Sequence, residues 1–451
     1  MMGCGGGYIS SEVDEEYEKL VLRMNPPRVT VDNTSSRKAT LVKVDSANKQ
    51  GSLLEVVQVL TDLKLSIKRA YISSDGEWFM DVFHVVDRHG NKLSDEGVVG
   101  RIEQSLEARA LRRSVGLQAA ANHTSVELIG RDRPGLLSEI FAVLTNLKCN
   151  VVGAEVWTHN SRMASVVYVT DESTGARIDD AERLSKIRHL LLYVLKGNQD
   201  KQSAKTAISM DSTHAERRLH QIMFADQEYE DGSVQEEDGI ADDDKNKPLI
   251  IVENCAEKGY TVVNVRSRDR PKLLFDTVCT LTDMQYVVSH ATVIAEEPEA
   301  CQEYYIRKAD GCPVSSEEER ARLANSLAAA IGRRATDGVR LELCCEDRIG
   351  LLSDVTRIFR ENGLSVIQAE VSTRGSQAVN AFYVVDASGN PVESHTIDAV
   401  RREIGQTILH VKDAASASSP PEDNGKFSFG TLFKTRSEKF LYNLGLIRSY
   451  S

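Results

Sequence analysis

Three short segments of the chain carry nearly the same letters, and their residue types suit the binding of a charged small molecule. The segments are RDRPGLLSEI (131–140), RDRPKLLFDT (268–277) and EDRIGLLSDV (346–355). In the first, Pro134 suits the first position of a helix, and Gly135 has no side chain, so a ligand can approach the free backbone N–H groups. These donors and the helix dipole suit a carboxylate, while Asp132 can accept from an ammonium group. A free α-amino acid carries both groups.

The residues predicted to contact such a ligand come from two of the segments. They are Asp132, Pro134, Gly135 and Leu136 in the first, and Asp347, Gly350 and Leu351 in the last. The leucine side chains are expected in the core, so they would contact a ligand through their backbone N–H groups. A simpler interpretation of each turn is a helix start whose Asp, Pro and Gly only shape the backbone. Both interpretations stay open.

Fixed distances between equivalent residues indicate that the segments belong to repeats of one unit. At one constant distance after the glycine or lysine of each turn come Ala154, Ala291 and Ala369, and at a second constant distance come Tyr168, Tyr305 and Tyr383. A weaker copy precedes them at QGSLLEVVQVL (50–60), with Ser52 aligned with Gly135 and with Ala70 and His84 one residue early. Such periodicity predicts four units.

Each unit shows the same order of strand and helix patterns, which the second copy displays clearly. TSVELIG (124–130) alternates as a strand, and 134–147 places apolar residues at helical spacing. A hairpin of two strands follows, then an amphipathic helix at 178–195 and a last strand at 204–210. The predicted order is βαββαβ, an α+β ferredoxin-like fold in which two helices cover one face of an antiparallel sheet.

The predicted boundaries divide the chain into four units, a linker and two tails. They are a flexible tail at 1–37, unit one at 38–117, unit two at 122–211, an acidic linker at 225–247, unit three at 248–336, unit four at 338–412 and a tail at 413–451. Unit three has no room for its own last strand, and PLIIVEN (248–254) ahead of its first strand is the replacement, so a permuted unit is predicted.

The free sheet edge of each unit predicts that units join side by side. The stretch of chain from Ser52 to Gly135, between the turns of units one and two, is similar in length to the stretch from Lys272 to Gly350, between those of units three and four. The stretch from Gly135 to Lys272 is much longer. This spacing favours pairing of unit one with unit two and of unit three with unit four.

Composition and charge exclude several classes of function. The formal charge of −12 and the pI near 5.5 argue against a nucleic-acid groove or an anionic membrane surface as partner. The sequence contains no apolar run of about 20 residues that would span a membrane. Eight cysteines, mostly in apolar patterns and without a C-x-x-C pair, predict buried free thiols in a reducing compartment. Cytoplasm is the expected location, with the nucleus as the alternative, and secretion is not expected.

Sequence motifs of enzymes are missing. The chain has no G-x-S-x-G elbow, P-loop, G-x-G-x-x-G after a strand or H-E-x-x-H motif, and no zinc-ligand spacing. We therefore expect no catalytic residues, no cofactor and no metal site.

The strand, the D-R-x-G-L-L turn, the helix and the hairpin, repeated along the chain, resemble the ACT domain, a regulatory module that binds amino acids in feedback-controlled enzymes. Four copies with almost no other domain are similar to the plant ACT domain repeat family, over about 39–411 and in the ending FSFGTLFKTRSEKFLYNLGLIRSYS. The resemblance implies ligand binding where two units join, at the Asp, Gly and Leu of units two and four. Units one and three depart from the pattern, with Lys49 and Ser52 in unit one and Lys272 in unit three.

Two functions from different classes remain open. One is an amino-acid sensor whose ligand biases a surface that contacts a regulatory protein. The other is an interaction scaffold without a ligand, whose sheets form a homo-oligomer or hold another protein. The segment 427–450 combines apolar side chains with Lys and Arg and is expected to dock on the chain's own core or on a partner.

Overall fold

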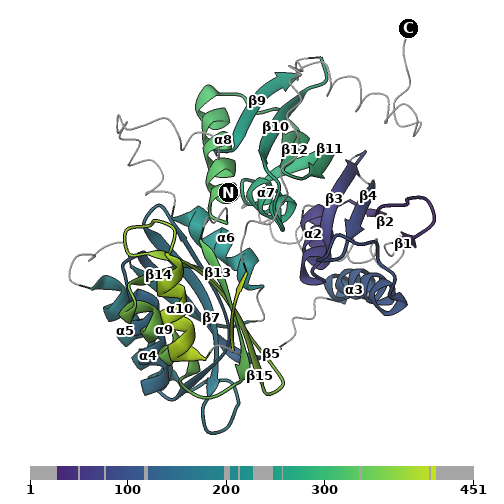
Figure 1. The fold of residues 1–451 in the computed structure, drawn as a ribbon. Helices are drawn as coiled ribbons and strands as arrows, with labels where there is room; N and C mark the ends of the chain where they lie inside the picture. Colours follow the sequence, from purple (N-terminus) through teal and green to yellow (C-terminus); the bar gives the residue numbers. More distant parts are fainter. Residues whose placement is uncertain are drawn as a thin grey trace, which may run out of the picture. The chain divides into compact units, whose positions relative to one another are not determined.

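The computed structural model describes residues 28–48, 51–75, 78–115, 120–197, 204–211, 214–226, 247–255, 257–334, 338–405 and 408–412. These residues form two eight-stranded antiparallel sheets, each with helices packed on one face, and one further helix packs on the other face of the second sheet (Figure 1). The predicted α+β fold with ferredoxin-like units that join side by side is confirmed. The linker residues 227–246, the tail from 413 onward and Cys4 lie outside the described residues.

The first sheet combines units one and three in the order β1-β2-β4-β3-β11-β12-β10-β9. Unit one supplies β1 (Arg28–Asp32), β2 (Thr40–Ala47), α2 (Ser52–Asp62), β3 (Ser66–Ser73), β4 (Trp78–Val86) and α3 (Glu96–Val115). Unit three supplies β9 (Leu249–Cys255), β10 (Tyr260–Arg268), α7 (Leu273–Asp283), β11 (Tyr286–Glu296), β12 (Glu299–Lys308) and α8 (Glu317–Gly332). The two units join at β3 and β11, where Ala70 pairs with Val293 and Ile72 with Ala291.

The second sheet combines units two and four in the order β16-β13-β15-β14-β6-β7-β5-β8. Unit two supplies β5 (Ala120–Arg131), α4 (Leu136–Asn146), β6 (Cys149–His159), β7 (Arg162–Asp171), α5 (Ala181–Lys196) and β8 (Lys205–Asp211). Unit four supplies β13 (Val339–Glu346), α9 (Leu351–Glu361), β14 (Leu364–Arg374), β15 (Gln377–Asp386), α10 (Ser394–Ile404) and β16 (Leu409–Lys412). The units join at β6 and β14, where Ala154 pairs with Val371 and Val156 with Ala369.

The pairing expected from spacing is therefore wrong, because unit one joins unit three and unit two joins unit four. Spacing along the chain reports only the length of the connection between two units. The entropy of closing a loop rises slowly with its length, so a longer connection does not prevent two complementary edges from meeting.

The two outer strands of the first sheet, β1 and β9, each come before the other strands of their unit in the chain. Strand β9 pairs with β10 in the place of a last strand, which is the permuted order predicted for unit three. Unit one has the same order, because β1 pairs with β2 and sets Val29 opposite Val44. The expectation of a flexible tail over 1–37 is thus wrong for residues 28–32, whose Val29 and Val31 pack against the core.

Helix α6 (Ala215–Ala225) lies outside the four predicted units, and the sequence analysis did not expect it. Its Leu219 and Met223 pack on Trp157 and Val166, on the sheet face opposite the other helices of units two and four. Trp157 is fully buried by this contact. Only Leu219, His220 and Met223 of this helix are buried, so its buried face is narrow.

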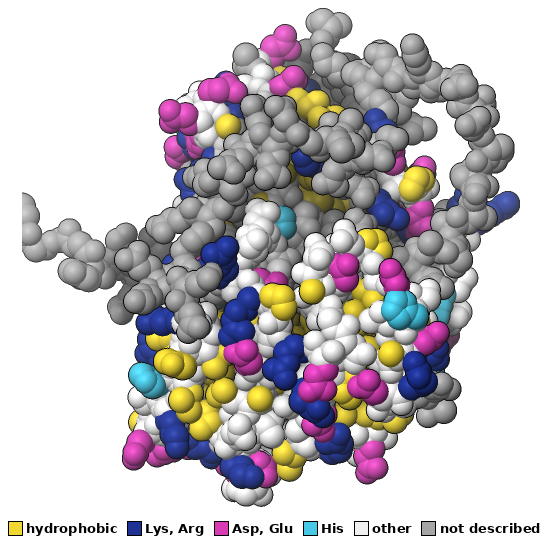
Figure 2. Space-filling model, turned by 60° about the vertical axis from the view of Figure 1, so that its left-hand side comes forward, with side chains coloured by type: hydrophobic (Ala, Val, Ile, Leu, Met, Phe, Trp, Pro, Cys, Tyr) yellow, Lys and Arg dark blue, Asp and Glu magenta, His cyan; other side chains and the backbone are white. Residues whose placement is uncertain are grey.

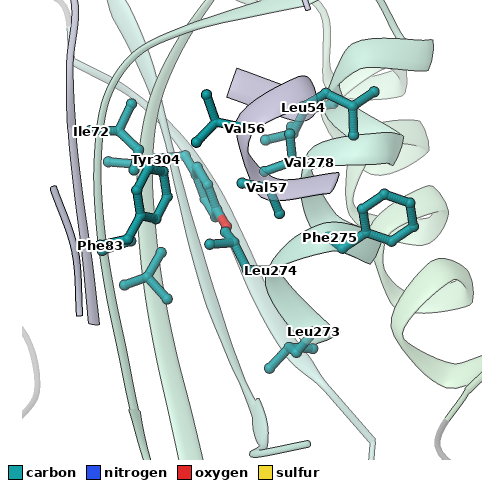
Figure 3. Packing of buried hydrophobic residues seen from close by; sticks show 14 of the residues in the cluster. Leu54, Val56, Val57, Ile72, Phe83, Leu273, Leu274, Phe275, Val278 and Tyr304 are labelled. Carbon is teal, nitrogen blue, oxygen red and sulfur yellow. The ribbon is translucent and has the colours of Figure 1, made fainter. Parts of the chain in front are cut away.

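The core of each half lies between its sheet and its helices. In the first half, Figure 3 shows Phe83 and Tyr304 on the strands facing Val57 of α2 and Leu274 of α7. Each of these side chains is at most 6% exposed. Burying a large apolar side chain stabilises the fold by roughly 1.5–3 kcal/mol. Because α2 and α7 belong to different units, this core also holds units one and three together.

Two further expectations concern thiols and surface charge. The seven described cysteines are free, but only Cys149 and Cys279 among them are buried, while Cys312 and Cys344 are exposed. The expectation that most are buried is therefore wrong. Figure 2 shows one face of the molecule, on which basic and acidic side chains are interspersed. Of the helices in the described ranges, none is long and apolar enough to cross a membrane.

Candidate functional site

The four strand–turn–helix segments share one backbone feature. The residue before each first helix has a left-handed conformation, with φ of 86° at Gly51, 81° at Gly135, 66° at Lys272 and 79° at Gly350. Glycine adopts this conformation without steric cost, whereas a lysine does so only when other contacts hold it.

The register of unit one follows from this geometry. Gly51, and not Ser52, is the equivalent of Gly135. Counted from Gly51, Ala70 and His84 follow at the same distances as the equivalent alanine and tyrosine of the other units. The expected departure at Ser52 and Lys49 is therefore wrong, and Asn48 takes the position of the aspartate.

The predicted site in unit two lies where this unit meets unit four, but it has little free space. Asp132, Gly135 and Leu136 line a cavity of about 20 Å³ together with Arg360 of α9. A cavity of that size holds about one water molecule. The Arg360 stem fills the rest, since a Cβ atom on Gly135 would lie 2.5 Å from its Cδ atom. Pro134 is exposed and lies outside the cavity lining.

Asp132 is the acidic residue in the lining of this small cavity. Burial raises its pKa to about 6, against the opposing hydrogen bond and charge of Arg133. Burial thus favours the neutral form of Asp132 more than it is favoured in an exposed aspartate.

The predicted site in unit four has different surroundings. The Asp347 carboxylate accepts a hydrogen bond from Thr373 Oγ1 at 3.0 Å, so a residue of its own unit occupies it. A Cβ atom on Gly350 would be 3.6 Å from Thr145 of α4, an ordinary contact, and Leu351 is 7% exposed. The structure therefore brings Asp347, Gly350 and Leu351 together in one turn against unit two.

The turn of unit three, which the sequence analysis set aside because of Lys272, borders a larger cavity. The cavity has a volume of about 110 Å³ and lies between this turn and the end of α2 and start of β3 in unit one. Its lining includes Asp269, Lys68, Thr61 and Gln302. Thr61 occupies the position on α2 that Arg360 occupies on α9, counted from Gly51 and Gly350 respectively. The smaller threonine side chain explains why space remains here.

Two acidic side chains, Asp269 and Glu297, and three basic ones, Lys68, Arg270 and Lys272, line the cavity. Lys68 Nζ lies 3.0 Å from Glu297 Oε1 and 3.4 Å from Asp269 Oδ2. Burial raises the pKa of Asp269, and the charge of Lys68 opposes this rise. Burial acts to lower the pKa of Lys68, but its bonds to Glu297 and Asp269 outweigh burial and raise it. Lys68 pairs with both carboxyl groups, whereas Arg270 and Lys272 pair with Asp276 and Glu216, which lie outside the lining.

Gln302 supplies a buried donor that the sequence analysis missed. The residue is 1% exposed, and its Oε1 accepts from the Tyr304 hydroxyl. Its Nε2 has no hydrogen-bond partner among the described residues. Buried amide groups are nearly always paired, so this donor at a cavity wall points to a missing acceptor.

A sequence signal for Gln302 exists in the repeat. Each unit has one polar residue at the same distance after its turn, on the helix-covered face of the second strand after its first helix (β4, β7, β12 and β15): Asp81, Ser165, Gln302 and Asn380. The polar letter stands each time within an apolar alternation, as in WFMDVFHVV (78–86). The register error at Ser52 concealed this regularity.

Comparisons with known proteins show which family this sequence belongs to. The profile of the ACR family N-terminal ACT domain matches residues 35–113, and that of the ACT domain matches 124–183 and 339–405. The chain is 55% identical to ACT domain-containing protein ACR4 of Arabidopsis thaliana, over 98% of this chain and 99% of that protein. It is 53% identical to ACT domain-containing protein ACR5 of the same plant, over 98% of both chains. The chain belongs to the ACR family of ACT domain-containing proteins.

Among solved structures, aspartate kinase from Synechocystis is similar to this ACR-family chain at 14% identity, with a TM-score of 0.17. The match covers 65% of this chain and 44% of the kinase.

The unit three turn of this ACR-family chain carries groups whose charges suit the two ends of a small zwitterion. The first backbone hydrogen bond of α7 runs from the Asp276 N–H to the Lys272 carbonyl oxygen at 3.0 Å. The Leu273 N–H donates to the Arg270 carbonyl oxygen at 3.4 Å, so the Leu274 and Phe275 amides are the donors that the helix start leaves over, and they suit a carboxylate. Asp269 and Glu297, in the lining of the same cavity, supply acceptors for an ammonium group.

Proposed function

We propose that this ACR-family chain is a regulatory protein that binds a free amino acid in the cavity between units one and three. The α-carboxylate is received by the first-turn amides of α7 and by Lys68. The α-ammonium group is received by Asp269. The Gln302 amide then donates to an oxygen atom of the ligand.

The observation that carries this proposal is the unpartnered Gln302 Nε2 in the wall of a cavity of about 110 Å³. An apolar cavity of about 150 Å³ is large enough for benzene, so the smaller volume here favours an amino acid with a short side chain. The matching cavity at unit two has only about 20 Å³, which favours a primary site at unit three rather than at units two and four.

The remaining parts of the proposal concern the setting of this activity. The protein acts without catalysis, cofactor or metal, in the cytoplasm or the nucleus, and its ligand alters contact with a regulatory protein partner. The alternative is a scaffold that holds its partner in the same way with or without an amino acid.

Isothermal titration calorimetry of the full chain with each of the twenty amino acids tests the proposal. We expect saturable heat from one or a few small amino acids. Asp269→Asn should weaken binding roughly 10- to 100-fold, as expected when a hydrogen bond to a charged group is lost. Asp132→Asn is the matched control, because it changes the equivalent aspartate beside the filled cavity and should leave the affinity unchanged.

The scaffold alternative makes the opposite prediction. No heat from any amino acid, together with a partner affinity that amino acids do not change, would establish it. Heat that Asp269→Asn and Asp132→Asn reduce equally would show that the ligand does not bind where we place it.

A further inference from the structure

The unit three turn faces two ways. Asp269, Arg270 and Lys272 all line the cavity. In addition, Lys272 pairs with Glu216 of α6, and Arg270 pairs with Asp276 of α7, which His220 of α6 also contacts. The same short turn therefore contacts both the proposed ligand and an element that belongs to none of the four ACT units.

Lys272 connects the turn to α6 and to the second sheet. Its Nζ lies 2.5 Å from Glu216 Oε1 of α6 and 3.8 Å from Glu370 Oε1 of β14. Glu370 is paired across the strands with Glu155 of β6, at the junction of units two and four. A cation carried by the unit three turn thus stands beside the place where the other two units join.

Arg270 connects the turn to a buried carboxylate. Its Nη1 lies 2.6 Å from Asp276 Oδ2, and Asp276 is fully buried. Asp276 Oδ1 also lies 2.8 Å from Nε2 of His220 on α6 and 3.1 Å from Arg334 Nη1. Burial acts to raise the pKa of Asp276, but the charges of Arg334 and Arg270 outweigh it and hold the pKa below its usual range.

The same cluster surrounds Trp157. The Arg334 guanidinium lies 4.9 Å from the centre of the Trp157 ring, and the His220 ring contacts it edge-on at 4.9 Å. Arg334 Nη1 is also 2.8 Å from Glu216 Oε2. Removing one member of a buried ionic cluster leaves an uncompensated charge, so the cluster has few alternative arrangements. A displacement at one end is then passed along the contacts, because a packed interior deforms little.

We propose that α6 responds to occupancy of the cavity between units one and three, through Arg270 and Lys272, and passes the change to the junction of units two and four. This inference rests on the proposed function, because it needs a ligand in that cavity. A ligand that binds Asp269 and Lys68 replaces their mutual contact and repositions the turn. Arg270 and Lys272 move with the turn because they are its next residues.

Trp157 is the natural reporter for this connection. The chain has two tryptophans, and Trp78→Phe removes the other one, which is 38% exposed. In the Trp78→Phe protein, each of the twenty amino acids is titrated while heat and Trp157 emission are recorded. We expect the emission to change and to saturate at the same concentration as the heat.

Glu216→Gln then removes the α6 end of the connection without touching the cavity. We expect it to keep the binding heat within about threefold and to reduce the emission change, because only the Arg270–Asp276–His220 contacts remain, while Glu216→Asp retains both. Glu182→Gln is the matched control, because Glu182 opens α5 in the same Ala-Glu-Arg sequence but is exposed. Circular dichroism confirms that each variant is folded.

The outcomes separate this inference from the proposed function. Heat without a Trp157 response in the Trp78→Phe protein overturns the inference and leaves the proposed function intact. If no amino acid gives heat, the proposed function fails. The inference is then tested with Lys68→Met, which removes the contact of Lys68 with Asp269, by measuring amide hydrogen exchange in α6. Faster exchange in α6 of that variant than in the parent supports the connection, and unchanged exchange in α6 overturns it.

Discussion

Arg360 on α9 lies so close to Gly135 that a Cβ atom on this glycine would be 2.5 Å from the arginine Cδ atom. Thr61 holds the equivalent position on α2 and leaves a cavity of about 110 Å³ beside the unit three turn. The size of one helix side chain therefore accounts for much of the difference in space between the two junctions.

Arg360→Thr should create a second amino-acid site. Removing the arginine stem is expected to enlarge the cavity of about 20 Å³ at Asp132 and Gly135, where the turn geometry of a binding site already exists. Calorimetry should show the number of bound amino acids rising from one to two per chain.

The control for this change is Arg357→Thr on the same helix. Arg357 is 49% exposed and pairs with Glu361 on the helix surface, so its removal should leave the stoichiometry at one. A stoichiometry of one in Arg360→Thr, with binding at unit three intact, would show that space alone does not make the unit two turn a site.

Asp132→Asn should stabilise the protein at neutral pH. The folded-state pKa of about 6 lies above the ordinary value of 3.8, so this group costs stability as pH rises from about 4 to 6, and the full cost persists above 6. The shift of about two units corresponds to at most about 3 kcal/mol. Urea unfolding at pH 7 should show a gain of this order for the variant.

The gain from Asp132→Asn should shrink toward zero below pH 4, where both states of the parent are protonated at this residue. Asp347→Asn provides the contrast, because Asp347 accepts a hydrogen bond from Thr373 and its replacement should lower stability at pH 7. Equal effects of the two substitutions at both pH values would refute the role of burial.

Gly51→Ala should destabilise unit one although nothing crowds the site. No atom lies within 4 Å of a Cβ added there, so the cost comes from the φ of 86° alone and should be about 1 kcal/mol. Gly100→Ala, in the open interior of α3, should instead stabilise by roughly 0.5–1 kcal/mol. Thermal unfolding measures the stability of both variants. An unchanged stability in Gly51→Ala would favour Ser52, rather than Gly51, as the equivalent of Gly135.

Leu219→Ala should lower the free energy of unfolding by about 2–5 kcal/mol, because Leu219 is fully buried against Trp157 and Val166. Tyr193→Ala on α5 removes a large side chain that is 75% exposed and should change stability by less than about 0.5 kcal/mol. Chemical unfolding followed by Trp157 emission compares the two. A small loss for Leu219→Ala would mean that α6 is not an integral layer of the fold.

Periodicity in the sequence was sufficient for the repeated order of strands and helices and for the replacement strand of unit three, because both depend on local pattern and on available chain length. It did not reveal β1, because RVTVD is too short to stand out ahead of a unit. It also did not reveal which units pair, since that depends on two edges that meet only in three dimensions.

The site was predicted in type but not in place. The turn and its aspartate were recognised from the repeated letters, whereas free space depends on the residue that faces the turn from another unit. That residue is Thr61 in one junction and Arg360 in the other, and neither belongs to the motif itself. Alignment on the leucine pair misplaced Gly51, because a left-handed φ is not visible in the letters.

The alternation of units between the two sheets has a consequence for how the chain is made. A ribosome releases the units in the order one, two, three, four, and partners are always two places apart. Strands β3 and β6 therefore have one unpaired edge until a further unit has been synthesised. Unpaired strand edges can form hydrogen bonds with other chains and cause aggregation. If the chain were cut at the acidic linker, each fragment would contain one unit of the first sheet and one unit of the second, and each of these units would lack its partner.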